Sequence, residues 1–92
     1  MTQPGTCTVR IASPQRSYTG GAAKVAAGGA TLSEVLADLD RRFPGIRFRM
    51  IDEQDAIRPH IRLYVETREV KSLSDPVGAL ETVHVICALS GG

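Results

Sequence analysis

The last two residues of the sequence, Gly91 and Gly92, are the first candidates for chemistry. They end the segment CALSGG, in which mostly apolar residues give way to two residues without side chains. Glycine loses the most conformational entropy on ordering, so a glycine pair at a chain end predicts a mobile tail. Such a tail is either incidental or recognised by another protein. We therefore expect a folded domain at 1–88 and a flexible tail at 89–92.

Other side chains with reactive groups lack the partners that their chemistry needs. His60 follows a proline and His84 lies among valines, without a convincing set of further metal ligands, so we expect no metal site. Ser90 adjoins the glycine pair, but no histidine or aspartate is placed to activate it as a nucleophile. Cys7 and Cys87 share strand faces with valines, which favours small core residues over a redox pair. The sequence therefore does not predict an enzyme.

The internal glycine pairs and the arginine-rich segment do not predict a nucleotide or nucleic-acid site. Gly20-Gly21 and Gly28-Gly29 neither precede a Lys-Ser/Thr at P-loop spacing nor form a G-x-G-x-x-G run, so they indicate turns. The segment RRFPGIRFR combines four arginines with two phenylalanines, but acidic residues lie close to it in the sequence (Asp38, Asp40 and Asp52). We interpret this segment as a solvated helix end rather than an RNA-binding site.

Size and composition indicate one globular domain. The chain has 92 residues, of which 42% are hydrophobic and 23% are charged, which is enough apolar material for one modest core. Eleven basic residues against ten acidic ones give a net charge of +1, so no strong attraction to nucleic acid or to an anionic membrane is expected. The N-terminal MTQPGT does not read as a secretory signal, and the apolar runs are too short for a bilayer. We expect a cytoplasmic protein with reduced cysteines.

The first part of the chain predicts a hairpin with a long connection. CTVRIA at 7–12 alternates apolar and polar residues as a half-buried strand does, and AAKVAA at 22–27 is a plausible second strand. Between them, SPQRSYTGG at 13–21 is expected to be extended and to close in a turn at its glycine pair.

The segment TLSEVLADLDRRF predicts the main helix. Thr31 and Glu34 form a Thr-x-x-Glu capping box at its start, and Pro44-Gly45 ends it. Two arginines in the last turn suit the helix dipole. The apolar residues recur at i, i+3, i+4, i+7 and i+11 and therefore form one stripe: Leu32, Val35, Leu36, Leu39 and Phe43.

Two later segments have the pattern of strands. HIRLYVE at 60–66 alternates strictly, and a short edge strand is expected around Val70. TVHVICAL at 82–89 is the last strand and is apolar on both faces near its end, as expected of a central strand. The segment IRFRMI at 46–51 permits either a strand or a short helical turn.

These elements predict an α+β fold. A single long helix must bury its apolar stripe, and a small sheet is the simplest partner for it. Placing the last strand beside the first gives a ubiquitin-like β-grasp: a mixed sheet of about four to five strands packed on one main helix.

The ordered set of segments resembles the ubiquitin-like sulfur-carrier family, which includes MoaD-like and ThiS-like proteins. The resemblance covers nearly the whole chain and ends in the free Gly-Gly. Thr19-Gly20-Gly21 and the polar loop before the strand at 60–66 look more like the CysO-type branch, which serves cysteine biosynthesis. The segments that carry the resemblance are RSYTGG, GGATLSEVLADL, GIRFRMID, HIRLYV and VHVICALSGG.

The resemblance implies a carrier protein. An E1-like partner would use ATP to adenylate the carboxylate of Gly92, and sulfur would then displace AMP to leave a C-terminal thiocarboxylate. Leu89, Ser90 and Gly91 would be recognised as they enter the active site of the partner. For the CysO-type branch, the resemblance also implies a cysteine-synthase-like acceptor with pyridoxal phosphate and a JAMM-type metalloprotease. The chain itself would bind no cofactor and no metal.

A surface for these partners is expected on the last strand. Ile86 and Ala88 should point away from the helix, beside the strand that carries Tyr64 and Arg62. An exposed apolar patch that leads to a reactive terminus is a surface that an activating enzyme can bind. We also expect Arg10 and Arg62 to lie on neighbouring strands and to select an acidic partner. Alternatively, the apolar residues of the patch contact the segment at 46–51.

Three other functions share these features. A MoaD-like small subunit of molybdopterin synthase would use the same tail chemistry in a stable complex. A ubiquitin-like modifier would form isopeptide bonds through its terminus. A plain interaction module would have an inert Gly-Gly. The sequence does not name the metabolite that receives the sulfur.

Overall fold

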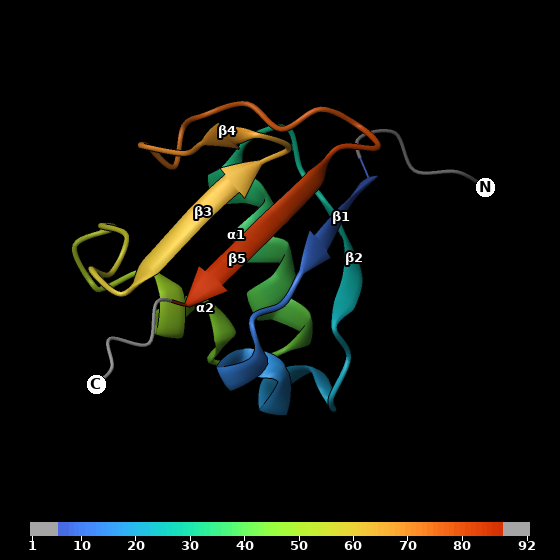
Figure 1. Ribbon diagram of the computed structural model, residues 1–92, viewed down its shortest axis with the longest axis vertical. Coiled ribbons are helices and arrows are strands. Elements are labelled where there is room, and N and C mark those ends of the chain that lie inside the picture. The colour runs from blue at the N-terminus through green and yellow to red at the C-terminus, as the bar shows by residue number, and fades with distance from the viewer. Residues whose placement is uncertain (1–5, 88–92) are drawn as a thin grey trace.

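The computed structural model describes residues 6–87, which form one mixed sheet over a main helix (Figure 1). The order of the strands across the sheet is β2-β1-β5-β3-β4. The strands are β1 (Thr6–Arg10), β2 (Lys24–Gly28), β3 (Ile61–Val65), β4 (Arg68–Glu69) and β5 (Thr82–Cys87).

The last strand lies at the centre of the sheet, as its apolar sequence predicts. β5 runs parallel to β1 and antiparallel to β3. β1 and β2 form the expected antiparallel hairpin, in which Val9 pairs with Val25. β4 pairs with β3 at the edge of the sheet and covers Arg68–Glu69, while Val70, the expected centre of this strand, follows it as a buried residue. The α+β arrangement with five strands and one main helix is therefore confirmed.

The main helix, α1 (Leu32–Arg42), begins and ends where its sequence predicts. The Glu34 amide donates to Oγ1 of Thr31 (3.3 Å), and Oε1 of Glu34 accepts from the Ala30 amide (2.7 Å), which completes the cap. Four side chains of the predicted stripe are fully buried against the sheet: Leu32, Val35, Leu36 and Leu39. Burial of each such side chain stabilises the fold by roughly 1.5–3 kcal/mol.

The sheet supplies the other half of the core through its inward-facing residues. Val9 and Val83 have no exposed surface, and Leu63 is 1% exposed. Cys7 is also buried, at 2% exposed, which confirms it as a core residue. None of the helices within residues 6–87 has the length and apolar character needed to cross a bilayer.

Two segments are helical where the sequence predicted an extended chain or left the choice open. The expectation of an extended arm at 13–21 is wrong, because Ser13–Thr19 forms a 3-10 helix, η1. Pro14 suits the start of this helix, and Gly20 ends it with a φ of 67°. The second segment forms the short helix α2 (Ile46–Met50), which settles the alternative between strand and helical turn.

Candidate functional site

The C-terminal tail continues from the end of the central strand. Cys87 is the last residue of β5, and Gly92 follows it by five residues. Gly92 and the expected recognition residues Leu89, Ser90 and Gly91, together with Ala88, lie outside the described residues. The structure therefore shows where on the domain the chain leaves β5. In Figure 1, this end of β5 lies beside α2 and the beginning of β3.

Three of the expected surface residues meet on the face of the sheet that points away from α1. Ile86 pairs with Arg62 across β5 and β3, and Tyr64 pairs with His84 two residues earlier on β5. Ile86 is 46% exposed, so the segment at 46–51 does not bury it. Ile86 is one of three large apolar residues that are exposed within residues 6–87; the other two are Phe48 and Leu80.

The expected pair of arginines is separated by the central strand. Arg10 lies on β1 and Arg62 on β3, and β5 runs between these two strands, so the expectation that they occupy neighbouring strands is wrong. Nη1 of Arg62 lies 3.1 Å from Oε2 of Glu69. Hydrogen bonds from Arg62 and then from Lys71 lower the pKa of Glu69 below its ordinary value. The charge of Arg62 is thus partly balanced within the chain.

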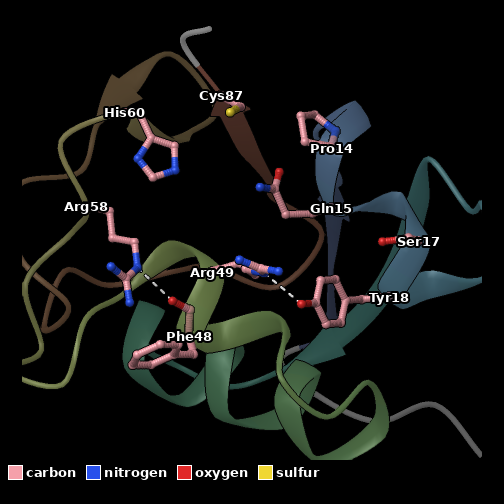
Figure 2. Close-up of a pocket in the computed structure, with 9 residues that line it drawn as sticks. All are labelled: Pro14, Gln15, Ser17, Tyr18, Phe48, Arg49, Arg58, His60 and Cys87. Atoms are coloured by element: carbon pink, nitrogen blue, oxygen red, sulfur yellow. Dashed lines mark hydrogen bonds between the residues drawn. The ribbon is translucent and has the colours of Figure 1, made fainter.

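A groove opens next to Cys87, and no sequence pattern predicted it (Figure 2). Its volume is about 560 Å³. η1 forms one wall, α2 another, and the segment before β3 a third. The residues that line it are Pro14, Gln15, Ser17, Tyr18, Phe48, Arg49, Arg58, His60 and Cys87.

Two arginines of this groove are held against aromatic rings. Nε of Arg49 donates to the hydroxyl of Tyr18 (2.7 Å), and its guanidinium lies 5.7 Å from the centre of the Tyr18 ring. Nε of Arg58 donates to the carbonyl oxygen of Phe48 (2.7 Å), and its guanidinium lies 4.4 Å from the centre of the Phe48 ring. These contacts fix the directions of both side chains. The segment RRFPGIRFR contains Arg49 and Phe48, so this part of the groove lay within a segment that the sequence marked as rich in arginine.

The cysteines and histidines do not assemble a metal site within residues 6–87. Cys7 and Cys87 are both free thiols, and His60 and Cys87 line the groove without further ligands of that kind. Burial raises the pKa of the Cys7 thiol, which favours its neutral form. No catalytic group of nucleophile and base is formed by these residues.

The comparison with curated proteins finds sulfur carriers. The chain is 31% identical over 90 residues to the sulfur carrier protein CysO of Mycobacterium tuberculosis and to that of Mycobacterium bovis. The match covers 92% of this chain and 97% of each relative. No family model matches the sequence.

Solved structures agree with the curated relatives. A chain of the Amycolatopsis orientalis BexX/CysO complex is 32% identical, with a TM-score of 0.87 over 94% of this chain and 99% of that chain. Mycobacterium tuberculosis CysO is 28% identical, with a TM-score of 0.84 over 90% of this chain and 99% of that one. SAMP1 of Haloferax volcanii covers 96% of this chain and 100% of its own with a TM-score of 0.80, but at 18% identity it shows the fold alone.

The relatives are named as carriers of sulfur, and the solved structure of Mycobacterium tuberculosis CysO has the same fold as this chain. The chain belongs to the family of CysO-type, ubiquitin-like sulfur carriers.

Proposed function

We propose that this chain carries sulfur as a thiocarboxylate on Gly92 and acts as a co-substrate of partner enzymes. The observation that carries the proposal is the 31% identity to named sulfur carriers over 92% of the chain. The sequence supports it, since Gly91 and Gly92 follow the central strand β5 by only a few residues. Glycines suit this position because they have no side chains to obstruct a narrow active-site channel.

The proposed loading reaction has two steps, both catalysed by an E1-like enzyme. A carboxylate oxygen of Gly92 first attacks the α-phosphorus of ATP, which forms an acyl-adenylate and releases pyrophosphate. Hydrosulfide then attacks the carbonyl carbon; the new C–S bond forms, the C–O bond to AMP breaks, and AMP leaves. The remaining proton goes to solvent, and the product is a thiocarboxylate anion. If a persulfide supplied the sulfur instead, the first product would be an acyl disulfide between the carrier and the donor. A thiol would then have to cleave its S–S bond to release the thiocarboxylate.

The proposed acceptor is a cysteine-synthase-like enzyme. That enzyme would hold the pyridoxal phosphate that activates the acceptor, and a JAMM-type metalloprotease would then release the new amino acid from the carrier. Nothing in this chain needs to bind either group. The proposal places these reactions in the cytoplasm, where the two free thiols of the chain would remain reduced.

A MoaD-like subunit or a protein modifier would use a similar tail. The relatives above 30% identity are named as sulfur carriers or belong to a complex that contains one. The likeness to the archaeal modifier SAMP1 is one of fold. We therefore favour the carrier over the modifier.

The test is the intact mass of the protein isolated from its own cells and treated with a reagent that alkylates thio-acids. The proposal expects a form in which one oxygen is replaced by sulfur, located at Gly92 and absent from a chain that lacks Gly92. If the chain keeps an ordinary carboxylate after incubation with ATP, sulfide and an extract of its own cells, the proposal is wrong. Stable conjugates to lysines of other proteins would instead support a modifier.

A further inference from the structure

Two arginines of the groove beside Cys87 have no carboxylate partner within the described part of the chain. The ion pairs there use other cations, namely Arg41, Arg42, Arg47, Arg62, Arg68 and Lys71. Among residues 6–87, no acidic residue lines the groove, whereas Arg49, Arg58 and His60 do. The groove therefore presents two arginines that form no ion pair with the residues the structure describes.

Asp52 is the acidic residue that interacts electrostatically with Arg58, but its carboxylate already accepts two hydrogen bonds within the chain. Its Oδ1 accepts hydrogen bonds from the Gln54 amide (2.8 Å) and the Ala56 amide (3.0 Å). These two bonds are the main reason why the pKa of Asp52 lies below its ordinary value, and Arg58 contributes less. No ion pair joins Asp52 to Arg58 among residues 6–87.

Both guanidiniums are arranged to receive a carboxylate. Each uses its Nε for a bond within the chain, Arg49 to Tyr18 and Arg58 to Phe48. Their terminal nitrogens have no acceptor among the described residues. The guanidinium of Arg49 lies 5.7 Å from the centre of the Tyr18 ring, and that of Arg58 lies 4.4 Å from the centre of the Phe48 ring. A planar, fixed guanidinium binds a carboxylate through two parallel N–H···O bonds at a smaller entropic cost than a free one.

A third residue of the groove points to a peptide rather than to a simple anion. Gln15 is 5% exposed, and its Oε1 has no hydrogen-bond donor within residues 6–87. Figure 2 shows its amide directed into the space between His60, Arg49 and Cys87. A buried amide oxygen needs a hydrogen-bond donor, and the backbone N–H of a peptide supplies one. A ligand with a carboxylate and a backbone N–H satisfies both features.

The groove also lies within reach of any protein that acts on the tail. Cys87 lines the groove and is followed by five residues up to Gly92. Five residues of fully extended chain span at most about 18 Å. An enzyme that encloses Gly92 therefore works within about 18 Å of Cys87, which lines the same groove as Arg49 and Arg58.

We propose that this groove is the docking site for an acidic loop of the activating enzyme, with its carboxylates on Arg49 and Arg58 and a backbone N–H on Gln15. The proposal rests on the proposed function, because it assigns the partner chemistry of the same tail. It is separate from the sheet surface around Ile86, which supplies apolar contact.

The test compares two doubly substituted full-length chains with the same change in net charge. R49E/R58E reverses the charge of the groove. K24E/K71E reverses the charge of two exposed lysines that do not line the groove: Lys24 is the first residue of β2, and Lys71 lies two residues after β4. The rate of thiocarboxylate formation is measured with ATP, sulfide and the activating fraction of an extract from the cells of origin. R49E/R58E should lower kcat/KM about tenfold or more, mainly through KM, and K24E/K71E should leave it unchanged. Circular dichroism and thermal unfolding check that both variants fold.

Salt provides a readout that does not depend on the folding of a variant. The kcat/KM of the unsubstituted chain should fall as KCl is raised, because the docking is electrostatic. R49E/R58E should lose most of this dependence. Equal kcat/KM for R49E/R58E and the unsubstituted chain, or a rate without salt dependence, would overturn the proposal.

A third measurement separates this proposal from the proposed function. The ¹⁵N-labelled full-length chain is titrated with a short peptide of alternating glutamate and glycine and, separately, with inorganic phosphate. The peptide should shift the Arg49 and Arg58 Nε signals and the Gln15 side-chain amide signals in a saturable way. If the peptide does so but no sulfur is ever loaded, the function is wrong and the groove is still a peptide site. If phosphate saturates the same signals at lower concentration than the peptide, the site binds small anions and the docking proposal is wrong.

Discussion

Ile86 on the central strand lies directly opposite Arg62 on β3, on the face of the sheet that points away from α1. The Ile86 side chain is 46% exposed, whereas Val83 and Val85, which lie on the same strand and face the core, are buried. Ile86 is followed by Cys87, the last residue of β5. An apolar side chain beside a charged one on an exposed face is the composition expected of a surface that binds a protein transiently.

Replacement of Ile86 should affect thiocarboxylate formation more than it affects folding. Ile86→Ser removes apolar contact from an exposed site, so the free energy of unfolding should change by no more than about 0.5 kcal/mol. The KM for thiocarboxylate formation should rise roughly tenfold if Ile86 is a main contact of the activating enzyme. Leu80→Ser is the matched control, because Leu80 is 91% exposed and lies in the loop that precedes β5. Equal KM values for the two variants would remove Ile86 from the partner surface.

Gly29 and Gly28 provide a test of how tightly β2 and α1 are joined. Gly29 has a φ of +148°, and a Cβ there would lie 2.7 Å from the Val35 amide nitrogen and 2.8 Å from Cβ of Glu34. Gly29→Ala should therefore lower the free energy of unfolding by roughly 1–3 kcal/mol. A Cβ on Gly28 meets no atom within 4 Å, so Gly28→Ala should change stability by less than about 1 kcal/mol. Urea denaturation measures both, and equal losses would contradict the assigned close approach.

The sequence was sufficient for the elements whose periodicity is strong. Leu32, Val35, Leu36 and Leu39 recur at helical spacing, and all four are buried where α1 meets the sheet. The last strand was placed at the centre because it is apolar on both faces near its end. In both cases a local pattern reports directly on burial, since the hydrophobic effect acts on each apolar side chain.

The groove could not be predicted because non-local polar contacts form it. Arg49 and Tyr18 are 31 residues apart and meet only once η1 and α2 are folded. η1 itself buries the polar residues Gln15 and Thr19, and Thr19 Oγ1 bonds to the carbonyl oxygens of Arg16 (3.1 Å) and Ala22 (2.8 Å). A segment that buries polar residues leaves no hydrophobic period in the sequence. The tail residues carry the proposed chemistry, and their pattern was visible in the sequence alone.

The carboxylate of Glu69 should report on the position of Arg62. Hydrogen bonds from Arg62 and then from Lys71 hold its pKa below the ordinary value of 4.5. A depressed pKa means that the ionised form is favoured by folding, so its contribution to stability is present at neutral pH and is lost as the pH falls through the folded-state pKa. Arg62→Gln should raise the pKa of Glu69 toward its ordinary value, and Lys71→Gln should raise it less. A ¹³C NMR titration of the side-chain carboxyl measures both shifts.

Arg68→Gln is the control for that titration, because Arg68 pairs with Glu81 (3.2 Å) instead of Glu69. It should leave the pKa of Glu69 in place. If Arg62→Gln leaves the titration of Glu69 unchanged, the ion pair does not persist in solution, and Arg62 is then free to bind an acidic partner on the sheet surface, as the sequence first suggested.

The two thiols should differ in reactivity. Cys7 is 2% exposed, and burial raises its pKa above the ordinary 9.0, so it is both shielded and poorly ionised. Cys87 is half-buried and lines the groove. Iodoacetamide at mildly alkaline pH should therefore label Cys87 first. Cys87→Ser should leave only a slow phase, and Cys7→Ser only a fast one.

The slow phase should follow the opening of the fold. Because the native state holds the Cys7 proton more tightly than the unfolded state does, this thiol stabilises the fold below about pH 9, and its contribution is lost as the pH rises through the raised folded-state pKa. Low concentrations of urea should speed the labelling of Cys7 while leaving that of Cys87 nearly unchanged. Cys7→Ala should lose less stability between neutral and alkaline pH than the unsubstituted chain. Equal labelling of both thiols in native buffer would mean that the β1–β5 core is open far more often than its burial implies.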